Sequence, residues 1–178
     1  INSEYFGLST GKLTMMATEE AADKGKISIN SSLQAGRGIS IVADKEIDVS
    51  ADHGIVAKDR DIDIISKNGH LNLLGDIIAE GATEGNITLS GKGYIKTTGI
   101  IDVVNGDFMA TANAFDGDPA SLTEDQNGGI TISENSSGQY SLQVAKGKAV
   151  LTAADKITVN TIVGVKKAFD ATAASDFI

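Results

Sequence analysis

The sequence predicts an all-β fold: a right-handed parallel β-helix with three strands per coil and roughly seven coils, interrupted by loop insertions. Three observations lead to this prediction. Short segments of the form apolar-x-apolar recur along the chain, and in its centre they return about every 24 residues. The chain is 41% apolar but only 4% aromatic, which favours a narrow, layered core. Its 20 glycines and single proline, Pro119, suit tight corners between short strands.

The apolar-x-apolar segments indicate strands, because side chains alternate between the two faces of a strand and both apolar residues then point the same way. A core built from such pairs needs no large rings. Ten pairs run through the sequence: Leu13/Met15, Ile27/Ile29, Ile39/Ile41, Ile47/Val49, Ile62/Ile64, Leu71/Leu73, Ile87/Leu89, Ile130/Ile132, Leu142/Val144 and Ile157/Val159.

Three separate registers repeat with one period in the centre of the chain, which predicts three faces per turn. A leucine-rich repeat shares the period but would carry an Asn-containing strand signature, which is missing. Successive coils of a β-helix stack at about 4.8 Å, so seven coils would form a rod of about 35 Å. The registers are Ile39, Ile62 and Ile87, with steps of 23 and 25; Ile47, Leu71 and Ile95, with steps of 24 and 24; and Ile55, Ile77 and Ile100, with steps of 22 and 23.

We expect the β-helix to span residues 1–164, with insertions near 17–24 and 113–128. Leu13, Ile27 and Leu33 would form the coil that precedes the central stretch. Residues 165–178 lose the two-residue alternation, which predicts a helical cap or a tail. A stacked rod exposes unpaired strand edges at its ends unless they are capped, and no polar cap is evident at the start. We therefore expect an excerpt from a longer rod.

Charge and composition exclude several classes of partner. The formal net charge is -9, from 24 acidic and 15 basic residues, which argues against nucleic acids and anionic membrane surfaces. The chain has no cysteine, so the fold contains neither a disulfide nor a thiolate metal ligand.

Asp59, Asp61 and Asp63 form the most suggestive carboxylate cluster. With Ile62 and Ile64 inward, Asp61 and Asp63 point outward, as the acids of β-helix polysaccharide lyases and hydrolases do. Such enzymes also need charged partners on neighbouring coils, whereas the aligned positions here are Gly38 and Ser40 below and Asn86 and Thr88 above. The pattern favours a solvated polar ladder, and we expect no catalytic residues.

The only two histidines, His53 and His70, lie on different registers. His70 is expected to point outward between Glu46 and Tyr94 of the adjacent coils. This arrangement is a surface ladder and a poor metal site.

The insertion at 113–128 carries four acidic side chains and no basic residue, and loops that leave a rigid scaffold often carry binding residues. Oxygen ligands at this density suit Ca²⁺, although the spacing is not that of an EF-hand. A plain acidic surface loop and a receptor contact are the alternatives. The candidate binding residues are Asp116, Asp118, Glu124 and Asp125.

Three Asn-x-Ser/Thr triplets begin at Asn30, Asn86 and Asn135 and are glycosylation candidates. A chain rich in serine and threonine also contains such triplets by chance.

Segments that begin with glycine and continue as a short apolar strand recur between residues 25 and 110: Gly25-Lys-Ile-Ser-Ile29, Gly38-Ile-Ser-Ile-Val-Ala43, Gly75-Asp-Ile-Ile-Ala-Glu-Gly81, Gly85-Asn-Ile-Thr-Leu-Ser90 and Gly99-Ile-Ile101. Through these segments about half of the chain resembles the filamentous-haemagglutinin family of two-partner secretion exoproteins. It implies a bacterial surface adhesin that is secreted unfolded through an outer-membrane transporter partner and folds at the cell surface. The absence of cysteine agrees with such threading. The family's Asn-Pro-Asn-Gly secretion motif is missing, so the resemblance implies a downstream passenger segment.

The expected function is therefore an extracellular structural and adhesive module that binds a receptor or glycan on a host or neighbouring cell. The alternatives are a carbohydrate-active lyase or hydrolase and a self-assembling surface filament, for which extended strand edges provide a route.

Overall fold

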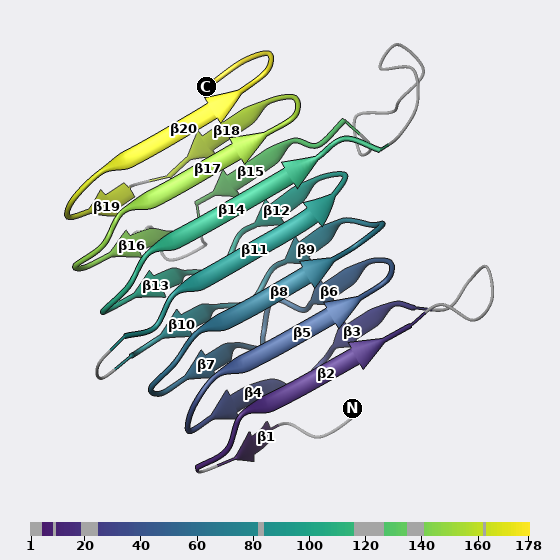
Figure 1. Cartoon of the computed structure of the whole chain (residues 1–178), viewed down its shortest axis with the longest axis vertical. Helices are drawn as coiled ribbons and strands as arrows, with labels where there is room; N and C mark the ends of the chain where they lie inside the picture. Colours follow the sequence, from purple (N-terminus) through teal and green to yellow (C-terminus); the bar gives the residue numbers. More distant parts are fainter. Residues whose placement is uncertain are drawn as a thin grey trace.

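The computed structural model of the chain is all-β, with three parallel sheets wound into a solenoid (Figure 1). The structure describes residues 5–8, 10–18, 25–81, 84–115, 127–134, 141–161 and 163–178. These residues form twenty strands and no helix, so none of them provides a helix that could cross a membrane. At three strands per turn, twenty strands make more than six turns, which confirms the predicted fold class.

Each sheet takes every third strand in chain order, which is the topology of a three-sided parallel β-helix. Sheet A contains β1 (Tyr5–Leu8), β4 (Ser32–Ala35), β7 (Ile55–Ala57), β10 (Ile77–Ala79), β13 (Ile101–Val103), β16 (Leu142–Val144) and β19 (Val163–Val165). Sheet B contains β2 (Leu13–Ala17), β5 (Ile39–Ala43), β8 (Ile62–Ser66), β11 (Ile87–Lys92), β14 (Phe108–Asn113), β17 (Ala149–Ala153) and β20 (Phe169–Ala173). Sheet C contains β3 (Ile27–Ile29), β6 (Ile47–Val49), β9 (Leu71–Leu73), β12 (Ile95–Thr97), β15 (Ile130–Ser133) and β18 (Ile157–Asn160).

The solenoid is right-handed. In Figure 1 the strands of sheet B run from left to right across the front, and the chain then returns behind them while it climbs towards the C-terminus. Right-handed crossovers are the rule for parallel strands, because the twist of the strands favours that connection.

The predicted registers are confirmed for two sheets and need one correction in the third. Ile39, Ile62 and Ile87 are successive partners in sheet B, and Ile47, Leu71 and Ile95 are successive partners in sheet C. In sheet A the partner of Ile77 is Ile101, and the predicted Ile100 was wrong by one residue. Ile100 is half-buried before β13, where its main-chain N–H donates to Asp76 Oδ1 (2.8 Å). Ile100 and Ile101 are adjacent and chemically identical, so the local sequence does not indicate which of the two faces the core.

The core is a column of aliphatic side chains, as the composition predicts. Along most strands buried and partly exposed residues alternate strictly, so one side of every sheet faces the interior. Phe108 is completely buried and stacks between Ile87 and Ala149, so the ring has a small side chain on one side. The small volume of Ala149 leaves room for the phenylalanine inside a narrow interior.

The expected helical cap or tail at 165–178 was wrong. Phe169–Ala173 is β20, which pairs in register with β17, and Phe177 makes a further parallel bridge to Ile157 of β18. The β-helix therefore extends beyond residue 164. Phe169, Ala171 and Ala173 do alternate, but alanine gives a weak strand signal, and pairing with β17 supplies what the local pattern lacks.

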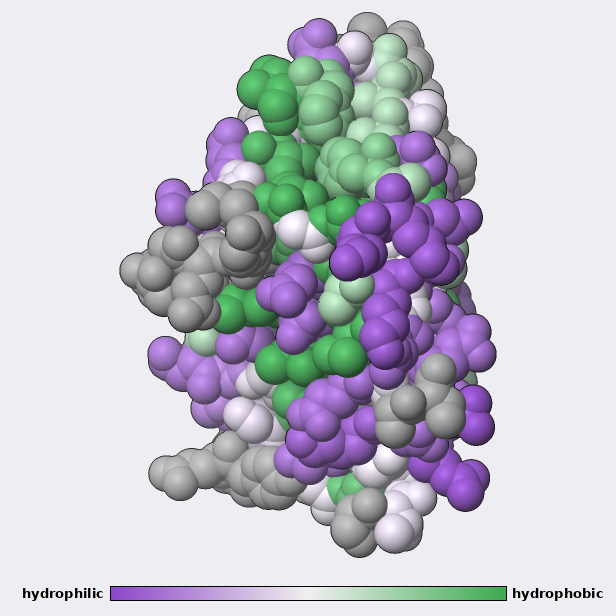
Figure 2. All heavy atoms as spheres, turned by 90° about the vertical axis from the view of Figure 1, so that its left-hand side faces the viewer, coloured by the Kyte–Doolittle hydropathy of each residue, from purple (hydrophilic) through white to green (hydrophobic). Residues whose placement is uncertain are grey.

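The last turn is less covered than the rest, because no further described rung packs on it. Val163, Val165 and Phe169 are half-buried, while Phe177 and Ile178 are 56% and 58% exposed. Figure 2 shows the molecule from the left-hand side of Figure 1. Apolar side chains gather towards the upper, C-terminal end of this face, and polar side chains are interleaved with them lower down.

The two predicted insertions lie beside described strands. β2 ends at Ala17 and β3 begins at Ile27, while β14 ends at Asn113 and β15 begins at Ile130. Residues 19–24 and 116–126, which make up most of these insertions, lie outside the described residues.

Candidate functional site

The carboxylates around β8 are parts of a ladder between coils. Asp61 is exposed, and its Oδ1 accepts hydrogen bonds from the main-chain N–H of Asn86 (2.7 Å) and from Asn86 Nδ2 (3.1 Å). Asp63 is half-buried in register between Ser40 and Thr88, as predicted. Asp59 lies 3.8 Å from Arg60 Nε. The arrangement agrees with the predicted polar ladder.

The same ladder continues along the rod, one residue per coil. Asn86 Oδ1 accepts a hydrogen bond from the main-chain N–H of Asp107 (2.8 Å), and Asp107 Oδ1 accepts one from the N–H of Lys148 (2.9 Å). Each side chain thus provides an acceptor for a main-chain N–H at the start of a strand in the next coil. Corner N–H groups need such partners, because the sheet ladder does not reach them. These polar residues are therefore structural.

The glycosylation candidates differ in their surroundings. Asn30 is exposed directly after β3. Asn86 holds Asp61 and Asp107 with both ends of its amide, so a sugar on its nitrogen would have to displace a hydrogen bond of the ladder. Asn135 lies outside the described residues.

The acidic candidates Asp116, Asp118, Glu124 and Asp125 also lie outside the described residues, and their calcium or receptor binding stays a prediction. Within the described ranges, no group of three or more His, Asp or Glu side chains is placed to hold a metal ion.

The histidines lie where their registers predict. His53 is half-buried in the corner between β6 and β7, where its N–H donates to the Ser50 carbonyl (3.2 Å). His70 and Tyr94 precede β9 and β12, and their rings stack with centroids 4.3 Å apart and an angle of 13° between the planes. Glu46, which precedes β6, forms a salt bridge with Lys26 (2.5 Å).

The residue immediately before each strand of sheet C contributes to one column along the rod, and His70 and Tyr94 belong to it. In order along the rod, the sheet C column is Lys26, Glu46, His70, Tyr94, Gly129 and Lys156. Gly129 is the only one of the six without a side chain. The column therefore has a gap between Tyr94 and Lys156.

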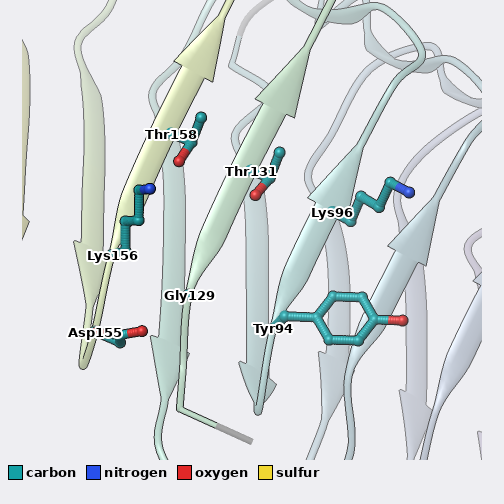
Figure 3. A pocket seen from close by; sticks show the side chains of 7 residues that line it. All are labelled: Tyr94, Lys96, Gly129, Thr131, Asp155, Lys156 and Thr158. Atoms are coloured by element: carbon teal, nitrogen blue, oxygen red, sulfur yellow. The ribbon is translucent and has the colours of Figure 1, made fainter. Parts of the chain in front are cut away.

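A hollow of about 260 Å³ lies over this gap. Its floor is Gly129, and its walls come from three consecutive coils, so stacking of β12, β15 and β18 creates it. In Figure 3 the ring of Tyr94 and the chain of Lys96 extend away from Gly129, while Asp155 points towards it from the opposite side. The residues that line the hollow are Tyr94, Lys96, Gly129, Thr131, Asp155, Lys156 and Thr158.

The backbone around Gly129 explains why the hollow forms here. Gly128 has a φ of 78°, in the left-handed region, at the point where the chain returns from the long insertion to β15. Gly129 follows it, and its carbonyl accepts from the N–H of Ile95 (2.9 Å) while the N–H of Ile130 donates to the Lys156 carbonyl (2.8 Å). The two glycines thus lead the chain into β15 without adding a side chain to the column.

The hollow combines cations with hydroxyl groups. Lys96 is exposed and Lys156 half-buried, and neither lysine forms a salt bridge within the described part of the chain. Thr131 and Thr158 are register partners on β15 and β18, and their side chains lie on the outer face. Asp155 Oδ1 accepts a hydrogen bond from Ser175 Oγ (2.7 Å), which engages one of its oxygens. The site can thus present ammonium groups and hydroxyls together.

A separate carboxylate, Asp102, lies on the outer face of sheet A. Partial burial, and secondly the charge of Glu80, raise the pKa of the Asp102 carboxyl above its ordinary value of 3.8. Its Oδ1 is enclosed and has no hydrogen-bond partner in the described structure. Glu80 itself forms a salt bridge with Lys58.

Sequence reasoning placed His70 and Tyr94 together but missed the hollow. Tyr94 and Gly129 are 35 residues apart in the sequence, because the insertion at 113–128 separates their strands. The alternation at Ile130 and Ile132 does indicate a strand in the sequence. The residues immediately before Ile95, Ile130 and Ile157 are Tyr94, Gly129 and Lys156, so these strand starts are enough to predict this part of the column.

No protein-family model, curated protein or solved structure matches this chain.

Proposed function

We propose that this chain is an extracellular structural and adhesive module of a bacterial surface protein, whose stiff rod presents a binding surface to a host or neighbouring cell. The observation that carries the proposal is the continuous aliphatic core, which runs through consecutive rungs of all three sheets. Such a core keeps outer side chains in fixed columns, and this suits recognition along an extended surface.

The distribution of the outer polar groups supports binding over catalysis. The Asp61 carboxylate accepts hydrogen bonds from the next coil, and Asp63 is flanked by hydroxyl residues of the adjacent strands. A carbohydrate lyase or hydrolase needs two or more acids or bases gathered around one scissile bond. The Asp61 carboxylate instead accepts from the backbone of the next coil, and the register partners of Asp63 carry no second acid or base.

The route to the cell surface is part of the proposal. The chain contains no cysteine, so no disulfide can form before it passes through an outer-membrane transporter in an unfolded state. Folding outside the cell would then proceed by stacking each coil on the one before it.

The test is binding of the fluorescently labelled chain to intact host epithelial cells and to bacterial cells. We expect saturable binding that excess unlabelled protein displaces. Binding that stays linear with concentration and resists competition would contradict an adhesive role.

Two further measurements on the same preparation separate the alternatives. Incubation with a panel of polysaccharides should release neither reducing ends nor unsaturated sugars, and turnover would favour an enzyme. Sedimentation velocity should give one species at every concentration, whereas growth into long assemblies would favour a filament subunit.

A further inference from the structure

We infer that a groove along the corner between sheets A and B binds an extended peptide segment that carries a cationic and an acidic side chain four residues apart. The inference deepens the proposed adhesive function and rests on it, because it names a protein segment as the ligand of one surface. A floor of stacked glycines, charges separated along the rod and the spacing of the coils carry the argument.

The floor of the groove is a column of glycines in the connections from sheet A to sheet B, which lie along the left-hand edge in Figure 1. Gly85, Gly106 and Gly147 each lie two residues before a strand of sheet B, in three consecutive coils. A Cβ added at Gly106 would lie 2.5 Å from the carbonyl oxygen of Gly85, and one added at Gly147 would lie 1.8 Å from that of Gly106. The three backbones therefore stack more closely than any side chain allows.

A hollow of about 390 Å³ lies over this floor, within the usual range of about 300–1,000 Å³ for ligand sites. Its lining comes from the connections before β11, β14, β17 and β20, so the hollow runs along the rod across four coils. This course suits an extended chain better than a compact ligand. The residues that line the hollow are Glu84, Asn86, Asn105, Gly106, Asp107, Lys146, Gly147 and Lys167.

The charges of the lining are separated along the rod. The acids, Glu84 and Asp107, come from the first two of the four coils, and the lysines, Lys146 and Lys167, come from the last two. Glu84 and both lysines are exposed and form no salt bridge in the described part of the chain. The Asp107 carboxylate already accepts a hydrogen bond from the main-chain N–H of Lys148. A ligand with a cation at one end and an anion at the other fits this groove, whereas a uniformly charged polymer is repelled at one end.

The length of the groove sets the spacing of the two charges in the ligand. Lys167 belongs to the last coil of the hollow, where its main-chain N–H donates to the Gly147 carbonyl (3.1 Å). Glu84 lies three coils earlier, which corresponds to about 14 Å along the rod at about 4.8 Å per coil. Residues four positions apart in an extended peptide point to the same side and lie about 13 Å apart. The two distances match.

The middle of the groove is neutral. It presents the backbone of Gly106 and Gly147 and the amide of Asn105, whose Nδ2 donates to the Gly81 carbonyl (2.5 Å). A floor without side chains lets another backbone approach closely. We therefore expect small, uncharged residues between the two charged residues of the ligand.

The test follows the amide resonances of the ¹⁵N-labelled full chain during titration with the blocked peptide acetyl-Lys-Ser-Gly-Ser-Glu-amide. We expect saturable shifts at the amides of Gly106 and Gly147 and their neighbours. The matched control, acetyl-Lys-Glu-Ser-Gly-Ser-amide, has the same composition and net charge but places its two charges side by side, and it should bind at least threefold more weakly. Equal binding of the two peptides, or shifts elsewhere on the rod, would overturn the inference.

Two further peptides separate this site from general charge effects. The dicationic acetyl-Lys-Ser-Gly-Ser-Lys-amide and the dianionic acetyl-Glu-Ser-Gly-Ser-Glu-amide should both bind more weakly than the peptide of mixed charge. Tighter binding of the dication would mean that the net charge of -9 alone attracts it. Tighter binding of the dianion would mean that the lysines serve an anionic polymer. Either result would overturn the inference.

Variants assign the two ends of the peptide. Glu84→Gln and Lys167→Gln should each weaken binding about threefold, the loss typical of one exposed ion pair. Glu134→Gln and Lys12→Gln remove the same charges at exposed positions outside the groove and should leave binding unchanged. Equal losses in all four variants would contradict the site.

A cycle between protein and peptide tests the pairing directly. In the Glu84→Gln variant, replacing the lysine of the peptide by glutamine should cause no further loss, because its partner is already gone. The same replacement should weaken binding about threefold in the parent chain. Equal losses in both backgrounds would show that the peptide lysine does not meet Glu84 and would overturn the proposed orientation and site.

Binding to cells separates this inference from the function on which it rests. If the chain binds cells but the peptide causes no saturable shifts, the inference fails and the adhesive function stands. If the peptide binds the groove but the chain does not bind cells, the adhesive function fails and the groove stands.

Discussion

His70 and Tyr94 stack their rings face to face, 4.3 Å between centroids, although 24 residues separate them in the sequence. One complete turn of the solenoid brings them together, and the stack fixes the ring that borders the hollow over Gly129. Aromatic pairs of this kind contribute energy beyond the area they bury.

We predict a coupling free energy of about 0.5–1 kcal/mol between these two rings. It is measured by a double-mutant cycle of His70→Ala, Tyr94→Ala and the double variant in urea unfolding. Additive losses, with a coupling near zero, would mean that the stack contributes nothing to stability.

Asn86→Ala should destabilise the fold by about 1–2 kcal/mol, because it leaves the main-chain N–H of Asp107 without its acceptor and removes the donor to Asp61. The matched control is Asn72→Ala, at the half-exposed central position of β9, where we expect little change. Chemical unfolding measures both variants. Equal effects would show that the corner ladder has no special role.

Gly75→Ala should destabilise by about 2–3 kcal/mol, because an added Cβ would lie 1.6 Å from the carbonyl oxygen of His53 and force the two coils apart. Gly54→Ala is the control at the same corner one coil earlier, where the Cβ would meet Asp76 O at 3.4 Å. Thermal unfolding should separate the two variants clearly. A tolerated Gly75→Ala would contradict the close approach of the coils.

Thr97→Val should stabilise the fold by about 1 kcal/mol. The Thr97 side chain is buried between Leu73 and Ile132 of the neighbouring coils, and its hydroxyl has no hydrogen-bond partner among the described residues. Valine keeps the branched shape without the polar atom. Thr111→Val, on the outer face of β14, tests for a general preference for valine in strands, and an equal gain there would remove the explanation.

Asp102 should make the fold less stable as pH rises. A raised folded-state pKa means that the folded chain binds this proton more tightly than the unfolded chain. Stability therefore falls between the ordinary pKa of 3.8 and the higher folded value, and this loss persists at neutral pH.

Asp102→Asn removes this dependence. The variant should melt at a higher temperature than the parent at pH 7, and the difference should shrink below the ordinary pKa of the carboxyl. Asp48→Asn makes the same change at the central outward position of β6 and controls for the loss of one negative charge. The same gain from both variants, or a gain for Asp102→Asn that does not vary with pH, would contradict this account.

The sequence predicted the strands of the central coils because their signal is local. Ile62 and Ile64 face inward whenever the segment is extended, and a period near 24 residues stacks them on Ile39 and Ile87 in any regular solenoid. The outward positions of Asp61, Asp63 and His70 follow from the same alternation. The polar ladder at Asp61 and Asn86 could thus be predicted from the register, though not its hydrogen bonds.

What only the tertiary structure decided depends on pairing between distant segments. Ile101 and not its neighbour Ile100 enters the core because β10 fixes the register, and Phe169–Ala173 becomes a strand because β17 lies beside it. The hollow over Gly129 exists because β15 joins β12 across a long insertion. The alternation of inward and outward side chains is a property of a single strand and can be predicted from its sequence. The register depends on which residues of two strands pair, and this is fixed only when the chain is folded.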